Sequence, residues 1–125
     1  MQEDKSMKIV KTNIEDLEQN GKMLYMLTNQ TSNTVAVSKM TDEQLDQSWP
    51  VDAYLIYEDD KNSYVSVLSG HTVLSGSSKP FRETFLKIVE AMKDEDFSIH
   101  VIHRVSASSS RKYVTCILDL DLDFG

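Results

Sequence analysis

The sequence predicts a mainly β, α+β domain, and three observations support this prediction. Alternating apolar and polar residues indicate short strands in the second half of the chain. An apolar stripe with spacings of three and four residues predicts one helix over about residues 79–92. Three strand segments precede this helix and two follow it, which is the element order of an OB-like, five-stranded, partly open barrel. Other α+β sheets are compatible with the same order.

The length and composition favour one folded unit. The chain has 125 residues, of which 40% are hydrophobic and 26% charged, which suits a single core. We expect one domain over residues 1–118, with residues 1–50 the least clearly patterned part, and an acidic C-terminal segment over residues 119–125. The single cysteine excludes internal disulfides, and the polar first ten residues lack a secretion signal. No apolar run approaches the ~20 residues of a membrane helix, so we expect a soluble, cytoplasmic protein.

The first half of the chain contains weak signals for short elements. Residues 7–12 are compatible with a strand, and residues 14–27 carry several apolar side chains, although Gly21 interrupts any helix there. Residues 41–45 predict a one-turn helix, because the cap residue Thr41 is followed three residues later by a glutamine.

The second half of the chain is easier to interpret. Residues 52–58 and 63–69 predict a hairpin around a polar turn, and residues 72–75 predict a third strand or a bent continuation of the second. Ser78 and the following proline predict the start of the helix. Residues 97–102 and 113–118 predict the last two strands, joined by a serine-rich loop.

The charge is distributed unevenly along the chain. The formal net charge is −7, and residues 1–60 alone carry −7, whereas residues 61–118 carry +3. Residues 97–118 contain no acidic side chain; their charged side chains are Arg104, Arg111, Lys112 and two histidines. The sequence therefore predicts a locally cationic face on an anionic molecule.

The sequence contains little that indicates catalysis. It has no glycine-rich phosphate loop and no zinc-type pair of cysteines or histidines. His100 and His103 suggest a metal site, but residues three apart in a strand point to opposite faces. Cys116 could be a nucleophile, but it alternates with apolar neighbours, which favours a buried, inert thiol. We expect no enzyme, no metal and no cofactor.

Aromatic and basic residues together suggest a binding surface for nucleic acid. Tyrosine rings on a sheet can stack on unpaired bases, and basic side chains can follow the phosphates. The alternative for each tyrosine is core or cross-strand packing, and Tyr54 and Tyr57 have opposite strand parity, so at least one should point inward. The candidate nucleic-acid-binding residues are Tyr54, Tyr57, Tyr64, Lys79, Arg82, Arg104, Arg111, Lys112 and Tyr113.

Three segments of the chain resemble, in order, the single-stranded DNA-binding proteins of small protein-primed bacteriophages. FSIHVIHRVSASSSRKYVTCIL (97–118) resembles their closing hairpin, VDAYLIY (51–57) their Ala-x-x-x-Tyr strand, and TVLSGSSK (72–79) the step before their helix. The resemblance implies a protein that coats displaced single strands during phage DNA replication, protects them from nucleases and assists the polymerase. It places Tyr57 at a family tyrosine that contacts DNA, whereas Leu74 replaces a second one. A phage-encoded chain would act in the host cytoplasm.

The C-terminal sequence LDLDLDF alternates strictly, which would place its three aspartates on one face of an extended segment. One interpretation is an edge strand whose charges discourage aggregation. The other is a partner-binding segment similar to the acidic tails of bacterial single-strand binders. That segment would bind replication proteins through Asp119, Asp121, Asp123 and Phe124. A homo-oligomer is compatible with the sequence, which does not define the oligomeric state, and we expect no membrane partner.

A second functional hypothesis is an acidic mimic of DNA. The net charge of −7 and the acidic clusters within residues 15–18, 42–46 and 58–60 suit an interaction protein that inhibits a nucleic-acid enzyme by presenting carboxylates in place of phosphates. Such a protein should ignore oligonucleotides and bind a basic protein.

Overall fold

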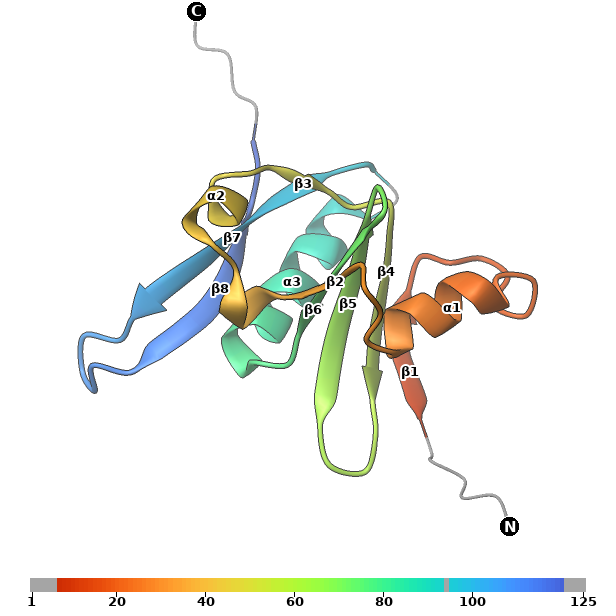
Figure 1. The fold of residues 1–125 in the computed structure, drawn as a ribbon, viewed down its shortest axis with the longest axis horizontal. Helices are drawn as coiled ribbons and strands as arrows, with labels where there is room; N and C mark the ends of the chain where they lie inside the picture. Colours follow the sequence, from red (N-terminus) through yellow and green to blue (C-terminus); the bar gives the residue numbers. More distant parts are fainter. Residues whose placement is uncertain (1–6, 94, 121–125) are drawn as a thin grey trace, which may run out of the picture.

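The computed structural model describes residues 7–93 and 95–120 and shows two β-sheets with one long helix, α3, packed against both (Figure 1). The five-stranded sheet has the order β1-β4-β5-β6-β2, in which β2 is parallel to β6 and the other pairs are antiparallel. Its strands are β1 (Lys8–Thr12), β4 (Ala53–Glu58), β5 (Ser63–Ser69), β6 (Thr72–Gly76) and β2 (Thr34–Ala36). The three-stranded antiparallel sheet has the order β3 (Trp49–Pro50), β7 (Ser98–Val105) and β8 (Lys112–Leu118).

The predicted α+β class is confirmed, and so is the helix between the third and fourth predicted strands, α3 (Lys79–Met92). The five predicted strands correspond to β4, β5, β6, β7 and β8, with β6 a separate third strand. They are divided between two sheets, and the described residues form no closed barrel. The physical reason is that α3 lies along β8: the Ser78 hydroxyl donates to the Val114 carbonyl at 3.0 Å, and the Thr115 hydroxyl donates to that of Thr84 at 3.1 Å.

The start of α3 is fixed by the predicted cap. The Ser78 hydroxyl accepts a hydrogen bond from the Phe81 amide at 3.3 Å, and a proline occupies the first turn. The apolar stripe of the helix then enters the main core, which also receives side chains from both sheets. The buried residues of the stripe are Phe81, Phe85, Ile88 and Val89.

The five-stranded sheet has two differently covered faces, because side chains alternate along a strand. Tyr54 and Ile56 belong to the main core on the α3 side. Leu55 and Val73 belong to a second, smaller core, which α1 (Gly21–Thr28) completes with Leu27. Helix α1 begins at Gly21, the residue that was expected to interrupt a helix in this segment. Gly21 therefore lies at the start of α1 and not within it.

The short predicted elements of the first half are also present. Strand β1 is in place, and α2 (Asp42–Leu45) has the expected capping box between Thr41 and Gln44. A short 3-10 helix, η1 (Val37–Lys39), lies between β2 and α2 in the chain. None of the helices in the described ranges has the length and apolar character to cross a membrane.

Gly76 allows strand β6 to approach α3 closely. A Cβ atom there would lie 2.8 Å from Phe81 Cδ2 and 2.9 Å from Val37 Cγ2. We predict that Gly76→Ala lowers the free energy of unfolding by about 1–3 kcal/mol, because a methyl group would overpack the core. Urea unfolding measures this loss. Gly21→Ala is the control, since a Cβ atom at that position would have no neighbouring atom within 4 Å, and it should be neutral or stabilising. Equal stability of Gly76→Ala and the wild type would contradict the close packing.

Candidate nucleic-acid interface

The predicted tyrosines occupy three different environments. Tyr54 is only 5% exposed, and its ring packs edge-on against Phe85 with centroids 5.5 Å apart. Tyr57 and Tyr64 stack on each other on the opposite face of the same sheet. Tyr113 is half-buried on β8, in the other sheet. The structure therefore corrects the assignment of Tyr54 as a binding residue: its burial in the core leaves no ring face for a base.

The β7–β8 hairpin has one buried and one accessible face. Val101 and Cys116 face each other across the strands and lie in the core. The side chains of alternate parity point the other way, and Ile117 among them is 44% exposed. The cross-strand pairs on this outer face are Arg104 with Tyr113, Ile102 with Thr115, and His100 with Ile117.

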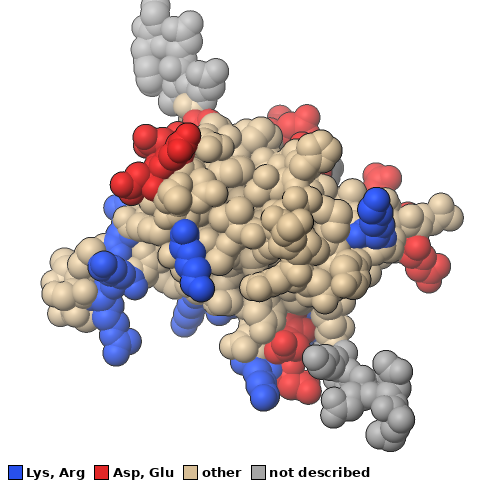
Figure 2. Space-filling view, in the orientation of Figure 1, with Lys and Arg blue, Asp and Glu red and all other residues tan. Residues whose placement is uncertain are grey.

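The free end of this hairpin brings four of the predicted residues together. Arg104 lies directly opposite Tyr113, and the next pair along the strands is Val105 with Lys112. The turn closes through a 2.8 Å hydrogen bond from the Ser106 amide to the Arg111 carbonyl. The side chains of all three basic residues are exposed, and Figure 2 shows Lys and Arg side chains gathered over this end of the molecule.

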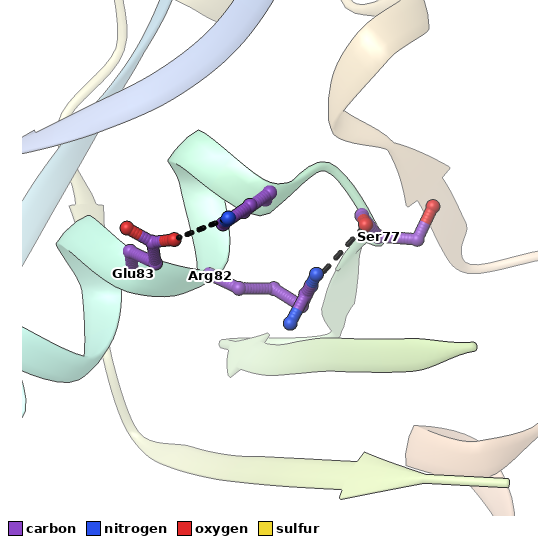
Figure 3. A network of polar contacts seen from close by, with 4 residues as sticks. Ser77, Arg82 and Glu83 are labelled. Carbon is purple, nitrogen blue, oxygen red and sulfur yellow. Dashed lines mark hydrogen bonds and ion pairs between the residues drawn. The ribbon is translucent and has the colours of Figure 1, made fainter.

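Lys79 borders the same surface because its neighbour Ser78 is bonded to Val114, the residue after Tyr113. The Lys79 ammonium lies 3.7 Å from the Glu83 carboxylate (Figure 3). Both side chains are well exposed, so this ion pair is weak and easily exchanged for another anion. We call Lys79, Arg104, Arg111, Lys112 and Tyr113, with the apolar Ile102 and Ile117, the hairpin surface. Arg104 and Tyr113 share its outer face with the two isoleucines, whereas Lys112 has the opposite strand parity and lies with Arg111 at the tip of the hairpin.

Arg82 does not belong to the hairpin surface. Its Nε donates to the Ser77 carbonyl at 3.3 Å, in the direction away from Glu83 (Figure 3). The side chain lines a hollow of about 380 Å³ beside the β4–β5 turn, which contributes Glu58, Asp59 and Asp60. Because these carboxylates would repel phosphate, we revise the assignment of Arg82 as a phosphate contact.

Asp119 is engaged within the fold, in contrast to its expected role in a partner-binding segment. The Ser48 hydroxyl donates to Oδ2 of Asp119, and His100 Nε2 lies 3.2 Å from Oδ1. The hydrogen bond from Ser48, together with the neighbouring His100, lowers the pKa of Asp119 against a desolvation that raises it. Asp121, Asp123 and Phe124 lie outside the described residues.

The two histidines have separate partners on opposite faces of β7, as strand parity predicted. His103 Nε2 lies 2.7 Å from the Val37 carbonyl oxygen, to which it donates when protonated. His100 faces Asp119. Within residues 7–93 and 95–120, no group of three or more His, Cys, Asp or Glu side chains could hold a metal ion.

Comparison of the chain with protein-family models, curated proteins and solved structures gives no match. A functional interpretation therefore depends on the residues and their geometry. Sequence reasoning did not include Ile102 and Ile117 in the site, although their strand parity matches that of Arg104 and Tyr113 and could have indicated them.

Cys116 should be unreactive in the folded protein. Its side chain is fully buried, and this burial raises its pKa to about 12, so the thiolate needed for attack is scarce near neutral pH. We predict that a disulfide reagent such as DTNB fails to modify the native protein at about pH 8 and modifies it fully in urea. Rapid complete reaction without denaturant would contradict the burial of Cys116.

Proposed function

We propose that this protein binds single-stranded nucleic acid on the hairpin surface and coats single-stranded DNA during phage-type replication. The observation that carries the proposal is the cross-strand pair of exposed Arg104 and half-buried Tyr113 at the basic end of β7 and β8. The proposed role implies a cytoplasmic protein, in the host cell if the chain is phage-encoded, without catalysis or cofactor.

The chemistry of this pair suits an unpaired nucleotide. A base stacked on a protein ring contributes about 1–3 kcal/mol, whatever its sequence. The planar guanidinium of Arg104 can bind a phosphate with two hydrogen bonds or stack on a second base. Ile102 and Ile117 continue the same face with apolar surface, which extends the contact beyond one nucleotide.

The net charge of −7 does not oppose binding at this place. Residues 97–118, which form the hairpin, contain no acidic side chain. The acidic side chains of α2, which contacts β7, form a separate group on the visible face, next to the Lys and Arg side chains of the hairpin end (Figure 2). A phosphate that approaches the hairpin itself therefore meets none of the hairpin's own carboxylates, because it has none.

The first test is the salt dependence of binding to labelled oligo-dT. Three phosphate contacts predict a slope of log K against log salt of about −2. Replacing Arg104, Arg111 and Lys112 with alanine should flatten this slope and weaken binding at low salt. The matched control replaces Lys8, Lys11 and Lys22, which lie on β1 and α1 and change the net charge equally. A slope that falls equally in both variants would remove the hairpin surface from the site.

The second test removes the stacking ring. Tyr113→Leu should weaken binding of oligo-dT by about 1–3 kcal/mol, because leucine keeps the apolar packing but offers no flat face. Tyr25→Leu, on the exposed side of α1, is the control and should bind like the wild type. Fluorescence anisotropy of labelled oligo-dT measures both variants. Failure of the wild type to bind oligo-dT at low salt would refute the proposed function.

The second candidate remains the acidic mimic of DNA. The observation that favours it is the set of exposed acids on and beside α2: Asp42, Glu43 and Asp46. In that case the protein would bind a basic nucleic-acid enzyme with an affinity that falls with salt, and oligo-dT would not compete. The oligo-dT titration separates the two functions directly.

A further inference from the structure

The face of the five-stranded sheet that α1 partly covers contains a pocket that the proposed function does not use. Its volume is about 390 Å³, within the range of about 300–1,000 Å³ that is usual for small-molecule sites. Buried Leu27 and Val73 contribute apolar wall, and Tyr57 and Tyr64 contribute aromatic wall. Polar side chains, among them Gln30 and Ser75, complete the lining.

The pocket exists because α1 covers only part of this sheet face. Leu24 and Leu27 of α1 pack in the smaller core with Leu55 and Val73. The helix ends at Thr28, and the β4–β5 hairpin extends beyond it (Figure 1). Tyr57 and Tyr64 lie near the end of this hairpin, directly opposite each other in the strand register.

The two tyrosines stack on each other and form one uncharged, aromatic side of the pocket. Their ring centroids are 5.1 Å apart with an angle of 27° between the planes. Burial raises the pKa of Tyr57, with smaller opposing and reinforcing contributions from Ser66, Tyr64 and Asp59, so its hydroxyl stays protonated at neutral pH. The Tyr64 hydroxyl donates to Asp59 Oδ2 at 3.3 Å, which fixes the second ring.

The charges around the pocket select against an anion. Among the lining residues that the structure describes, Asp59 is the only one with a charged side chain. Its Oδ1 also accepts hydrogen bonds from the Lys61 and Asn62 amides, so this carboxylate stabilises the β4–β5 turn. The described lining contains no lysine or arginine, so a phosphate would find no cationic partner in this pocket. A neutral planar ring would find the two tyrosines.

Polar groups at the rim are available for directional hydrogen bonds. In the described part of the chain, neither the Gln30 carboxamide nor the Ser75 hydroxyl has a hydrogen-bond partner. A glutamine carboxamide presents a donor and an acceptor side by side, and this arrangement matches the adjacent amino group and ring nitrogen of adenine. Contact with the aromatic pair and this paired hydrogen bond together define a base-sized site.

We propose that this pocket binds one neutral purine ring, with adenine as the best match. The ring could come from a free nucleoside or from a base in a single strand, since both present the same heterocycle. The inference goes beyond the proposed function, because it involves neither the cationic residues nor Tyr113 of the hairpin surface.

Two-dimensional NMR with adenosine, AMP and oligo-dA tests the proposal and identifies the source. We expect adenosine to shift the ring signals of Tyr57 and Tyr64 and leave Tyr25 unchanged. AMP should bind no more tightly than adenosine. If oligo-dA shifts the signals of these two rings and adenosine does not, the purine site is supported and its ligand is a base within a single strand. The proposal is overturned if neither adenosine nor oligo-dA shifts these rings, or if AMP binds more than about tenfold tighter than adenosine.

Variants separate this pocket from the hairpin surface. Tyr64→Leu should weaken purine binding by about tenfold or more, because it removes half of the ring pair. Gln30→Ala, at an exposed position that leaves the fold intact, should weaken it by a similar factor. Tyr25→Leu is the control. The Arg104, Arg111 and Lys112 triple variant should keep full purine binding, so failure of the proposed function would not affect this result. Unchanged purine binding in Gln30→Ala and Tyr64→Leu would refute the assignment.

Discussion

The packing of α3 between the two sheets is the constraint on which the rest of the structure depends. Phe81 and Phe85 are fully buried in the main core, to which strands of both sheets contribute. The Ser78 hydroxyl accepts from the first turn of the helix and donates to β8, so one side chain both starts α3 and fixes its distance from the hairpin. This arrangement places the helix start beside Tyr113 and explains why two sheets form in place of one continuous barrel.

Local patterns were sufficient to predict most elements, because alternation and helical spacing depend only on neighbouring residues. They placed β4, β5, β6 and α3, and the parity argument separated Tyr54 from Tyr57. They could not predict that β2 pairs in parallel with β6, or that β1 adds to β4, because these pairings join segments far apart in the chain.

The candidate surfaces were also predictable to different degrees, because local patterns reveal which sequence neighbours lie together but not which distant segments do. Arg104, Arg111, Lys112 and Tyr113 lie together because a hairpin keeps sequence neighbours close. Arg82 is three residues after Lys79, about 300° around the helix, and so reaches a different side of the molecule. The purine pocket was not predicted, since Gln30, Tyr57 and Ser75 come from a loop and two strands that only the folded chain brings together.

The link between Asp119, Ser48 and His100 fixes a negative group at the base of the β7–β8 hairpin, while its positive groups lie at the tip. Arg104 lies six positions after Ser98, the residue beside Asp119, and six steps are about 20 Å of extended chain. Counterions at physiological ionic strength damp electrostatic forces over about 8 Å. Asp119 therefore has little electrostatic influence on the tip of the hairpin, and a polyanion that reaches the tip from solution is hardly affected by this carboxylate.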